Sequence, residues 1–505
     1  MSGNKVVVIG AGLSGLSTGI YLRMHGYGVR ILEHGRHAGG VASYWKRRGY
    51  NIDGGIHFHT ACGPGQSVRH LYEELGIARD GKYRQTDLYS RFQDAETGSL
   101  LDVTSDLDQL ARDMAAQALQ DKKFIKRFIA DVKGMRGLPF DLGMAKPLEL
   151  STWRDGPSMF LRHGFKLRFF SGRFNRSVAE TVQEMENPWL REVFRHLFLP
   201  EVPLWFAMYM LSAVSQGAVW LRLDGCAGFV ADLVERYLSL GGEITFQARA
   251  EKILVESDRA TGVRVRHAQS VESEDIPADI VVSAADGAST IFELLDGKYT
   301  DNAIRQRYKE WPLFEPYVMA TFGVDRDLAH IPWSVILKAG RDFSRGHLRG
   351  DWMSLRNFHY APEASPPGKG LIQVMCDSSW EPWQELRDDP EAYKAEKEAA
   401  AAEMLDRLDA FEPGLAASVD MIDVATPHTL HRYTLNQRGA WEGFLPTPQA
   451  LRVRIPKTLP GLDNFYMAGQ WTSAGGGVLP CLYSGRHIAQ ILCRSTGQPF
   501  APRRA

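Results

Sequence analysis

The sequence predicts an α/β protein built around a discontinuous Rossmann-like domain, into which a second, α+β domain is inserted. Two observations at opposite ends of the chain support this prediction. A strand, a glycine-rich turn and a helix follow one another in residues 5–33, and the same succession returns in residues 462–493. The third observation is the long interval between them, where helical and strand patterns replace the glycine motifs. Two such elements imply one domain that is assembled from separated segments.

The N-terminal element is a βαβ unit. Four apolar residues, Val6–Ile9, are mostly β-branched and too few for a helix, so they predict a strand buried on both faces. Glycines then follow with the spacing G-x-G-x-x-G, and apolar residues recur at helical spacing. A second short strand, Val29–Leu32, ends in Glu33.

Each part of this unit has a physical role in binding a dinucleotide. The first glycine permits the tight turn, the second lets the backbone approach a pyrophosphate, and the third allows close packing of helix and strand. The helix N-terminus offers free N–H groups to the phosphates, and the acid can accept hydrogen bonds from a ribose while disfavouring a 2′-phosphate. A chance glycine-rich turn would not predict the acid. The predicted contacts are Gly10, Gly12, Leu13, Ser14, Gly15 and Glu33.

Composition narrows the class of protein. The 505 residues allow two or three domains, and the net charge of −1 gives no electrostatic case for binding nucleic acid. Five scattered cysteines form no CxxC pair, so no zinc site or disulfide framework is predicted, which fits a cytoplasmic protein. We expect no signal peptide. The longest apolar run, Leu204–Val219, is too short and too polar to span a bilayer.

A second glycine motif lies just past the strand that ends at Glu33. Gly39 and Gly40 stand together, and Tyr50–Phe58 reads Y-N-I-D-G-G-I-H-F. In this order, the motifs resemble the FAD-dependent superfamily of phytoene desaturases, carotenoid isomerases and retinol saturases, which is allied to the flavin amine oxidases. The resemblance implies that the dinucleotide is FAD and that the glycine pair and Val41 pass close to it. An uncharged residue after the pair is typical of isomerase- and saturase-like members.

Two later blocks match the same superfamily. In residues 222–285, a helix and several strands are predicted to return the chain to the FAD domain, and the resemblance implies a backbone contact to the adenine from Val255. Near the C-terminus, it implies that a strand end touches the ribityl–phosphate part of FAD. It also implies that a helix from about Cys481 to Cys493 points its positive N-terminus at the flavin. The predicted contacts in this last block are Gly469, Gln470, Gly477, Val478 and Leu479.

These blocks divide the chain into two predicted domains. The FAD-binding domain comprises residues 1–75, 222–300 and 455–505, and the substrate-binding domain comprises residues 76–221 and 301–454. In the first substrate segment helical patterns dominate, and their aromatic and methionine residues suit a helical core or, as a set, an adaptable apolar pocket.

The resemblance implies hydride chemistry at flavin N5, which is desaturation, saturation or isomerisation of an apolar substrate such as a polyene or natural product. A proton must also move, and the candidate acids or bases are His57, His59, His428 and His431. We expect FAD to be non-covalent, because no base stands beside Cys481 in the sequence. Oxygen, a quinone or another acceptor would reoxidise the flavin, since the sequence shows no second Rossmann insert that would bind a nicotinamide cofactor.

Two other functions fit the same pattern. One is an amine oxidase-like enzyme, whose usual marker is an aromatic cage before the flavin; the nearby aromatic residues are Tyr433 and Trp441. The other is a non-catalytic protein like the prenyl-binding GDP-dissociation inhibitors, against which Glu33 and the C-terminal glycine loop argue. An apolar substrate also leaves open a peripheral contact with a membrane.

Overall fold

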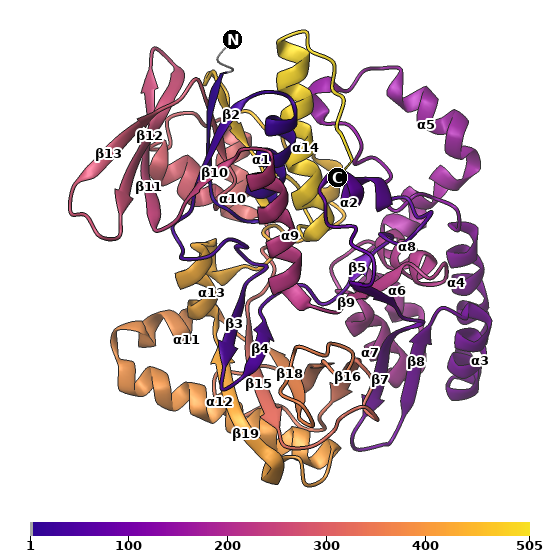
Figure 1. Ribbon diagram of the computed structural model, residues 1–505. Coiled ribbons are helices and arrows are strands. Elements are labelled where there is room, and N and C mark those ends of the chain that lie inside the picture. The colour runs from indigo at the N-terminus through magenta and orange to yellow at the C-terminus, as the bar shows by residue number, and fades with distance from the viewer. Residues whose placement is uncertain (1–3, 505) are drawn as a thin grey trace.

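The computed structural model describes residues 4–504 (Figure 1). Within them, the first layer is a parallel sheet of five strands in the order β10-β2-β1-β14-β20. These strands are Glu243–Thr245, Gly28–Leu32, Lys5–Ile9, Ile280–Ser283 and Phe465–Met467. Segments from the beginning, the middle and the end of the sequence therefore lie side by side in one sheet.

Both faces of this sheet are covered, which explains why β1 carries an unbroken apolar run. Val6 and Val8 pack with the helices of one face, and Val7 and Ile9 pack with an antiparallel three-stranded sheet on the other. The helices are α1 (Leu13–Met24), α9 (Gly225–Ser239) and α14 (Val478–Ser495). The small sheet contains β11 (Ala248–Glu256), β12 (Arg259–His267) and β13 (Ser273–Pro277), and α10 (Asn302–Glu310) packs on the same face.

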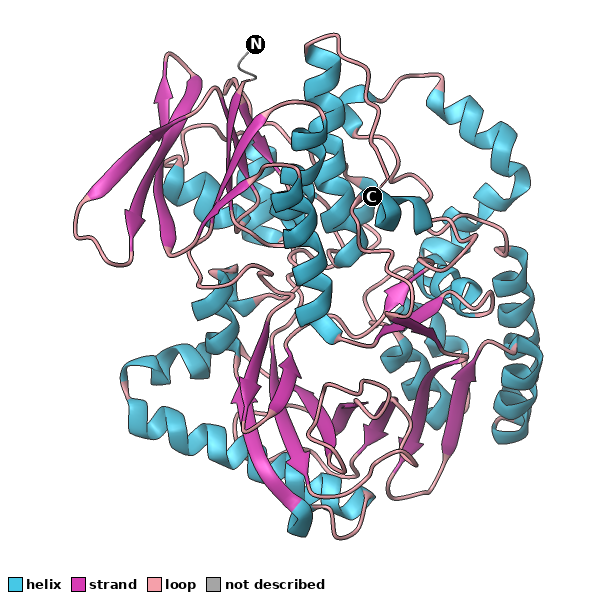
Figure 2. Ribbon diagram, in the orientation of Figure 1, coloured by secondary structure: helices cyan, strands magenta, loops and turns pink. Residues whose placement is uncertain are grey.

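A second sheet forms the lower part of the molecule in Figure 2. It has seven strands in the order β19-β15-β18-β17-β16-β7-β8. They are Val419–Ala425, Tyr317–Val324, Gly370–Asp377, Trp352–Asn357, Ser334–Lys338, Leu88–Asp94 and Leu100–Thr104. Helix α12 (Pro390–Phe411) packs against it through the buried side chains of Met404 and Leu408. Leu405 of the same helix is partly buried against this core.

Residues 107–214 form a helical region with its own hydrophobic core. Its helices are α3 (Leu107–Gln117), α4 (Lys122–Gly134), α5 (Asp155–His163), α6 (Val178–Thr181), α7 (Pro188–Leu197) and α8 (Leu204–Val214). On either side of this region, four strands are not predicted from the sequence: β6 (Tyr83–Gln85), β7, β8 and β9 (Val219–Arg222). In β7, alternate residues are buried, so the signal was a period of two rather than a helical period.

Short elements connect these parts. The hairpin β3 (Tyr44–Arg47) and β4 (Tyr50–Asp53) leads from the parallel sheet toward the second sheet, and β5 (His59–Thr60) pairs with β9. The remaining α-helices are α2 (Arg69–Glu74), α11 (Trp380–Glu385) and α13 (Pro427–Thr434). Among the described residues, no helix is both long enough and apolar enough to cross a membrane.

Candidate active site

A cavity of about 1700 Å³ is lined by residues of both large sheets. At one end its walls are the carboxyl ends of β1 and β2 and the glycine turns that follow β1 and β20. At the other end they are residues of α7, α8, β16 and β17. Because the carboxyl ends of parallel strands meet at one edge, two glycine turns more than 450 residues apart open into the same space.

Two helix N-termini form the glycine end of the cavity. Helix α1 begins after Gly12 and α14 after Gly477, and in neither does a capping side chain take up the free N–H groups. Free N–H groups and aligned peptide dipoles suit a phosphate at one helix and a ring that gains negative charge at the other. The predicted contacts that line the cavity here are Gly10, Gly12, Leu13, Ser14, Gly469, Gln470, Gly477, Val478 and Leu479.

The predicted contact Gly15 does not line the cavity. A Cβ at this position would collide with the carbonyl oxygen of Gly10, so the missing side chain is what allows α1 to pack on the turn. Gly10 itself has a φ of +97°, which side chains of L-residues rarely adopt. Gly15 therefore supports the turn by close packing, and the residues that precede it line the cavity.

The second glycine pair packs directly on the first turn. The N–H of Gly39 donates to the carbonyl oxygen of Ala11 at 2.9 Å, and a Cβ on Gly40 would lie 3.2 Å from the Cα of Gly12. Both glycines and Val41 line the cavity. The pair thus brings a second backbone segment to the place where the phosphates would lie.

Glu33 is held rigidly at the end of β2. One carboxylate oxygen accepts from the N–H of Ala11 at 2.7 Å, and the other accepts from the N–H of Gly35 at 2.6 Å. The side chain is buried but lines the cavity. Each carboxylate oxygen has a further lone pair, so Glu33 can still accept hydrogen bonds from ribose hydroxyls.

Two buried donors in the C-terminal loop fit a flavin ring. The side-chain Nε2 of Gln470 and the indole Nε1 of Trp471 have no hydrogen-bond partner among the described atoms, and both residues line the cavity. A buried donor without a partner is costly, and the carbonyl and nitrogen acceptors of a flavin would satisfy such donors. The residues present therefore fit the cofactor.

The block of residues 222–285 lines the cavity, but not at the predicted contact Val255. Three residues at the start of β11 line it: Ala248, Arg249 and Ala250. Val255 does not, and packs beside the hydrophobic core between the parallel sheet and the three-stranded sheet. The direction of β11 explains the difference. The N–H of Ala248 donates to the carbonyl oxygen of Glu33 at 2.9 Å, and from there β11 runs away from the site. An adenine contact from this strand would come from its first residues.

The four candidate histidines have different surroundings. His57 lines the cavity and has no hydrogen-bond partner among the described residues, while burial and the nearby Arg356 lower its pKa to about 3. His59 is buried; its Nδ1 lies 2.8 Å from the hydroxyl of Tyr72, and burial, followed by the charge of Arg222, lowers its pKa to about 3. Both imidazoles are therefore neutral at pH 7.

The other two histidines lie on α13. His431 lines the cavity and its Nδ1 is 2.9 Å from the carbonyl oxygen of Asn436. His428 does not line it and packs near the rings of Trp380 and Tyr393. The structure thus brings three of the four predicted histidines to the cavity and leaves His428 outside.

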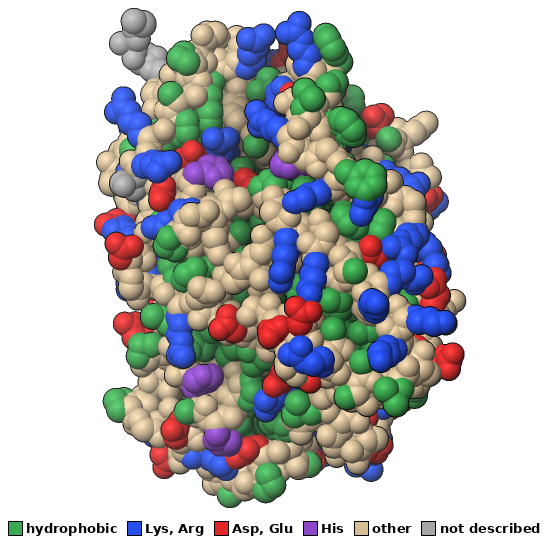
Figure 3. All heavy atoms as spheres, turned by 90° about the vertical axis from the view of Figure 1, so that its right-hand side faces the viewer, with side chains coloured by type: hydrophobic (Ala, Val, Ile, Leu, Met, Phe, Trp, Pro, Cys, Tyr) green, Lys and Arg blue, Asp and Glu red, His purple; other side chains and the backbone are tan. Residues whose placement is uncertain are grey.

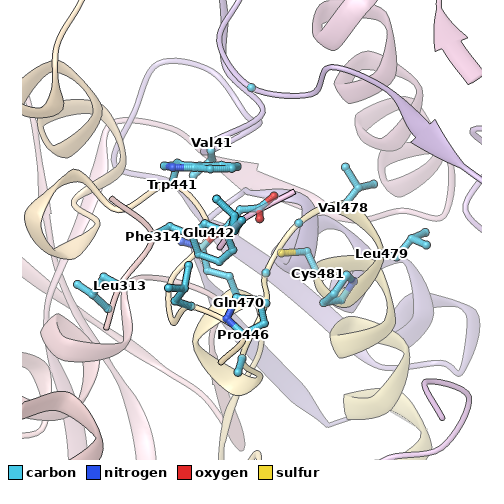
Figure 4. Close-up of a pocket in the computed structure, with 18 of the residues that line it drawn as sticks. Val41, Leu313, Phe314, Trp441, Glu442, Pro446, Gln470, Val478, Leu479 and Cys481 are labelled. Atoms are coloured by element: carbon cyan, nitrogen blue, oxygen red, sulfur yellow. The ribbon is translucent and has the colours of Figure 1, made fainter. Parts of the chain in front are cut away.

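Glu442 is the acidic group that the sequence reading missed. Its side chain points into the centre of the pocket, between Trp441 and the start of α14 (Figure 4). A Cβ on Gly477 would lie 3.1 Å from its carboxylate oxygen. Burial raises the pKa of this carboxyl to about 7, because the ionised form is poorly solvated there. A carboxyl that titrates near neutral pH can both give and take a proton. The only sequence signal was an acid between apolar residues and Gly443.

Cys481 and the aromatic residues bear on the alternatives. Burial, together with the charge of Glu442, raises the pKa of the Cys481 thiol to about 12, so the nucleophilic thiolate is scarce at pH 7. Trp441 packs against Phe314 and Tyr317, whereas Tyr433 is 60% exposed. Trp441 and Tyr433 form no ring pair among the described residues.

These features define a dinucleotide-dependent redox enzyme, and a comparison with protein families makes the class specific. Residues 13–493 match the family of flavin containing amine oxidoreductases, and the chain belongs to that family. The predicted flavin-dependent oxidoreductase is thereby confirmed, as is the resemblance on which that prediction rests.

Individual proteins show where the chain lies within this class. It is similar to the chloroplastic prolycopene isomerase of Arabidopsis thaliana, with 25% identity over 310 residues that cover 59% of this chain and 49% of that protein. It is also similar to the neurosporene-forming phytoene desaturase of Rhodobacter capsulatus, with 25% identity over 99% of this chain and 94% of that one. The structure of an oxidoreductase from Methanosarcina mazei shares the fold, with a TM-score of 0.62 and 17% identity over 96% and 100% of the two chains.

Proposed function

We propose that this protein is an FAD-dependent oxidoreductase that performs hydride chemistry on an elongated apolar substrate such as a polyene. The supporting observation is the continuity of the cavity, which joins the glycine turns to a wall of aromatic side chains from the helical region. That wall includes Phe140, Phe170, Phe198, Trp205, Phe206 and Tyr209. The similar isomerase and desaturase are named for prolycopene and phytoene, which are polyenes.

FAD would be held without a covalent bond. The phosphates would lie at the N-terminus of α1, the ribose at Glu33 and the ring ahead of α14, where Gln470 and Trp471 need acceptors. This arrangement supports the predicted division, in which residues 1–75, 222–300 and 455–505 bind the cofactor and residues 76–221 and 301–454 hold the substrate. The protonated thiol of Cys481 argues against a covalent anchor.

The flavin, when bound, supplies a hydride acceptor or donor at N5. The protein must hold the substrate against the ring, exclude water and move one proton. We infer that the carboxyl of Glu442 moves that proton, because it lies in the pocket beside α14 and titrates near pH 7. In a desaturation it would take up the proton that leaves the substrate, and oxygen or a quinone would be the final electron acceptor.

The outer surface next to the cavity suits contact with a membrane. Four large apolar side chains on and around α5 are exposed by 62–86%: Trp153, Phe160, Leu161 and Phe165. Arg154, Arg162 and Lys166 stand among them, and Figure 3 shows basic and hydrophobic side chains intermixed on the face that includes the helical region. Met159 and Leu167 of the same segment line the cavity. We infer that this segment docks on an anionic bilayer, from which an apolar substrate could enter.

Liposome co-sedimentation of the purified holoprotein tests the docking segment. Replacing Trp153, Phe160 and Phe165 by serine should reduce binding to vesicles with one-third anionic lipid about tenfold or more, because each aromatic ring contributes buried apolar area. Serine in place of the exposed Leu238 on α9 is the control and should leave binding unchanged. Equal binding of both variants would contradict the inference.

The function itself is tested by a spectrum and a product analysis. Flavin absorbance that enters the supernatant after acid precipitation would show non-covalent FAD. The holoprotein would then be incubated with a linear polyene in liposomes, with a quinone or oxygen present, and the products separated by chromatography. A product with altered double bonds supports the proposal. Oxidation of a panel of amines without polyene conversion would favour the amine oxidase alternative, and a protein that takes up no FAD would overturn both.

A further inference from the structure

A half-buried arginine lines the cavity without a counter-charge. Arg356 is on β17; its Nη1 donates to the hydroxyl of Ser334, and its Cζ lies 5.2 Å from the centre of the Trp333 ring. Among the described residues, no Asp or Glu oxygen lies within 4.0 Å of its guanidinium nitrogens, and its buried Nε has no hydrogen-bond partner. The charge is therefore held by one hydroxyl and one ring face.

The groups around Arg356 are neutral hydrogen-bond donors rather than anions. His57 is the imidazole whose pKa the arginine lowers, and Tyr89 is a neighbouring phenol that faces the same cavity. Ser90 extends the set, because its hydroxyl is 2.9 Å from that of Ser334. Burial lowers the pKa of Arg356 itself, which shows that the protein alone solvates this cation poorly.

A fully buried arginine shows how the same chain matches a charge that serves only the fold. The guanidinium of Arg222 pairs with both Asp224 and Asp232. Burying a cation without such partners costs several kcal/mol, so an unmatched arginine that faces a cavity indicates an anion in the ligand.

We propose that Arg356 binds the carboxylate of an amphiphilic substrate, whose apolar chain extends through the cavity toward the flavin. This inference rests on the proposed function and narrows its substrate class to polyene or other long-chain acids. A carboxylate matches the site better than a phosphate, because one guanidinium among neutral groups balances one negative charge and can donate two parallel hydrogen bonds to the two carboxylate oxygens.

A matched pair of fluorescent polyenes tests the proposal. The probes are trans-parinaric acid and its methyl ester, which differ only in the charge of the head group, titrated into the purified holoprotein. The wild type should bind the acid at least tenfold more tightly than the ester. Arg356→Met should remove that preference and leave ester binding unchanged, and Arg356→Lys should retain part of it. Arg195→Met is the control, because it removes a cavity-lining but exposed arginine, and the preference should persist.

Equal binding of acid and ester by the wild type, no binding of the acid, or an undiminished preference in Arg356→Met would each overturn the proposal. Flavin content and melting temperature of every variant show whether it is folded. They also separate two failures: a protein that keeps FAD and converts a neutral polyene, yet shows no acid preference, refutes only this inference. A protein without FAD refutes the proposed function.

Discussion

Two polar clusters, formed around the neighbouring histidines His57 and His59, differ in how their charges and donors are matched. In the first, His59 is hydrogen-bonded to Tyr72 and lies near Arg222, whose charge is matched by two aspartates. In the second, His57 has no hydrogen-bond partner among the described residues, and the nearby Arg356 has no carboxylate within 4.0 Å. Burial lowers the pKa of both histidines to about 3, so their protonation does not distinguish them.

The difference lies in what completes each cluster. The first is complete within the chain, which is how a structural network is satisfied. Both histidines line the cavity, but only the second cluster leaves donors and charge unused there, which is the arrangement expected where a ligand supplies the missing partner. Glu442 belongs to the second kind, since its carboxyl also faces the cavity and titrates near neutrality.

The largest expected effect is on Glu442. Glu442→Gln keeps the shape of the side chain but removes the titrating proton, so kcat for a polyene should fall about 10²- to 10⁴-fold. Since the carboxylate form is the base, kcat/KM of the wild type in a desaturation should rise with pH through about 7. That limb should vanish from the profile of the variant.

Flavin content, measured by absorbance, should be the same in both proteins, because Gln470 and the helix N-termini remain. Glu235→Gln, at an exposed position on α9, is the control and should leave rate and pH profile unchanged. An unaltered pH limb in Glu442→Gln would assign the proton transfer to another group and place Glu442 among structural residues.

The next prediction tests whether the two arginines differ in their contribution to stability. Arg222→Met removes the buried partner that Asp224 and Asp232 share and leaves them only the more exposed Lys82 and Arg79, so the free energy of unfolding should fall by about 3 kcal/mol. Arg356→Met removes a charge that no carboxylate matches, so in the absence of substrate it should cost less than about 1 kcal/mol or be stabilising. Melting temperatures of the two holoprotein variants, followed by flavin fluorescence, measure the difference. A loss of stability in Arg356→Met as large as in Arg222→Met would show that both arginines are structural.

The sequence predicted the parts of the site that depend on local backbone geometry. The turn at Gly10–Gly15 and the helix that begins after Gly477 follow from glycine spacing beside a short strand, and the chain belongs to the family of flavin containing amine oxidoreductases. Val255 was placed on a strand that exists, but only the opposite end of that strand reaches the cavity. Spacing along one segment does not reveal the direction in which it leaves a site.

Glu442 and Arg356 could not be singled out from the sequence. Their proposed roles follow from what their surroundings lack, which is water at the carboxyl and a carboxylate at the guanidinium. An acid or an arginine in a sequence is most often solvated at the surface. Only the packing around Glu442 shows that its carboxyl is deprived of water, and only the three-dimensional neighbourhood of Arg356 shows that no carboxylate is near.

At neutral pH the smallest expected effect separates the two histidines. At pH 7.5, His59→Asn should lower the free energy of unfolding by about 1–2 kcal/mol because the buried bond to Tyr72 is disturbed, whereas His57→Asn should change it by less than about 0.5 kcal/mol.

Below pH 6.5 the unfolded chain protonates both histidines, but the folded chain does so only near pH 3. The unfolded state therefore binds more protons in this window, and wild-type stability should decrease as the pH falls, by up to about 1.4 kcal/mol per pH unit for each histidine. Each variant should lose stability less steeply than the wild type between pH 6.5 and 4. A variant as steep as the wild type would mean that its histidine is already protonated in the fold, and for His57 that would add a second positive charge beside Arg356.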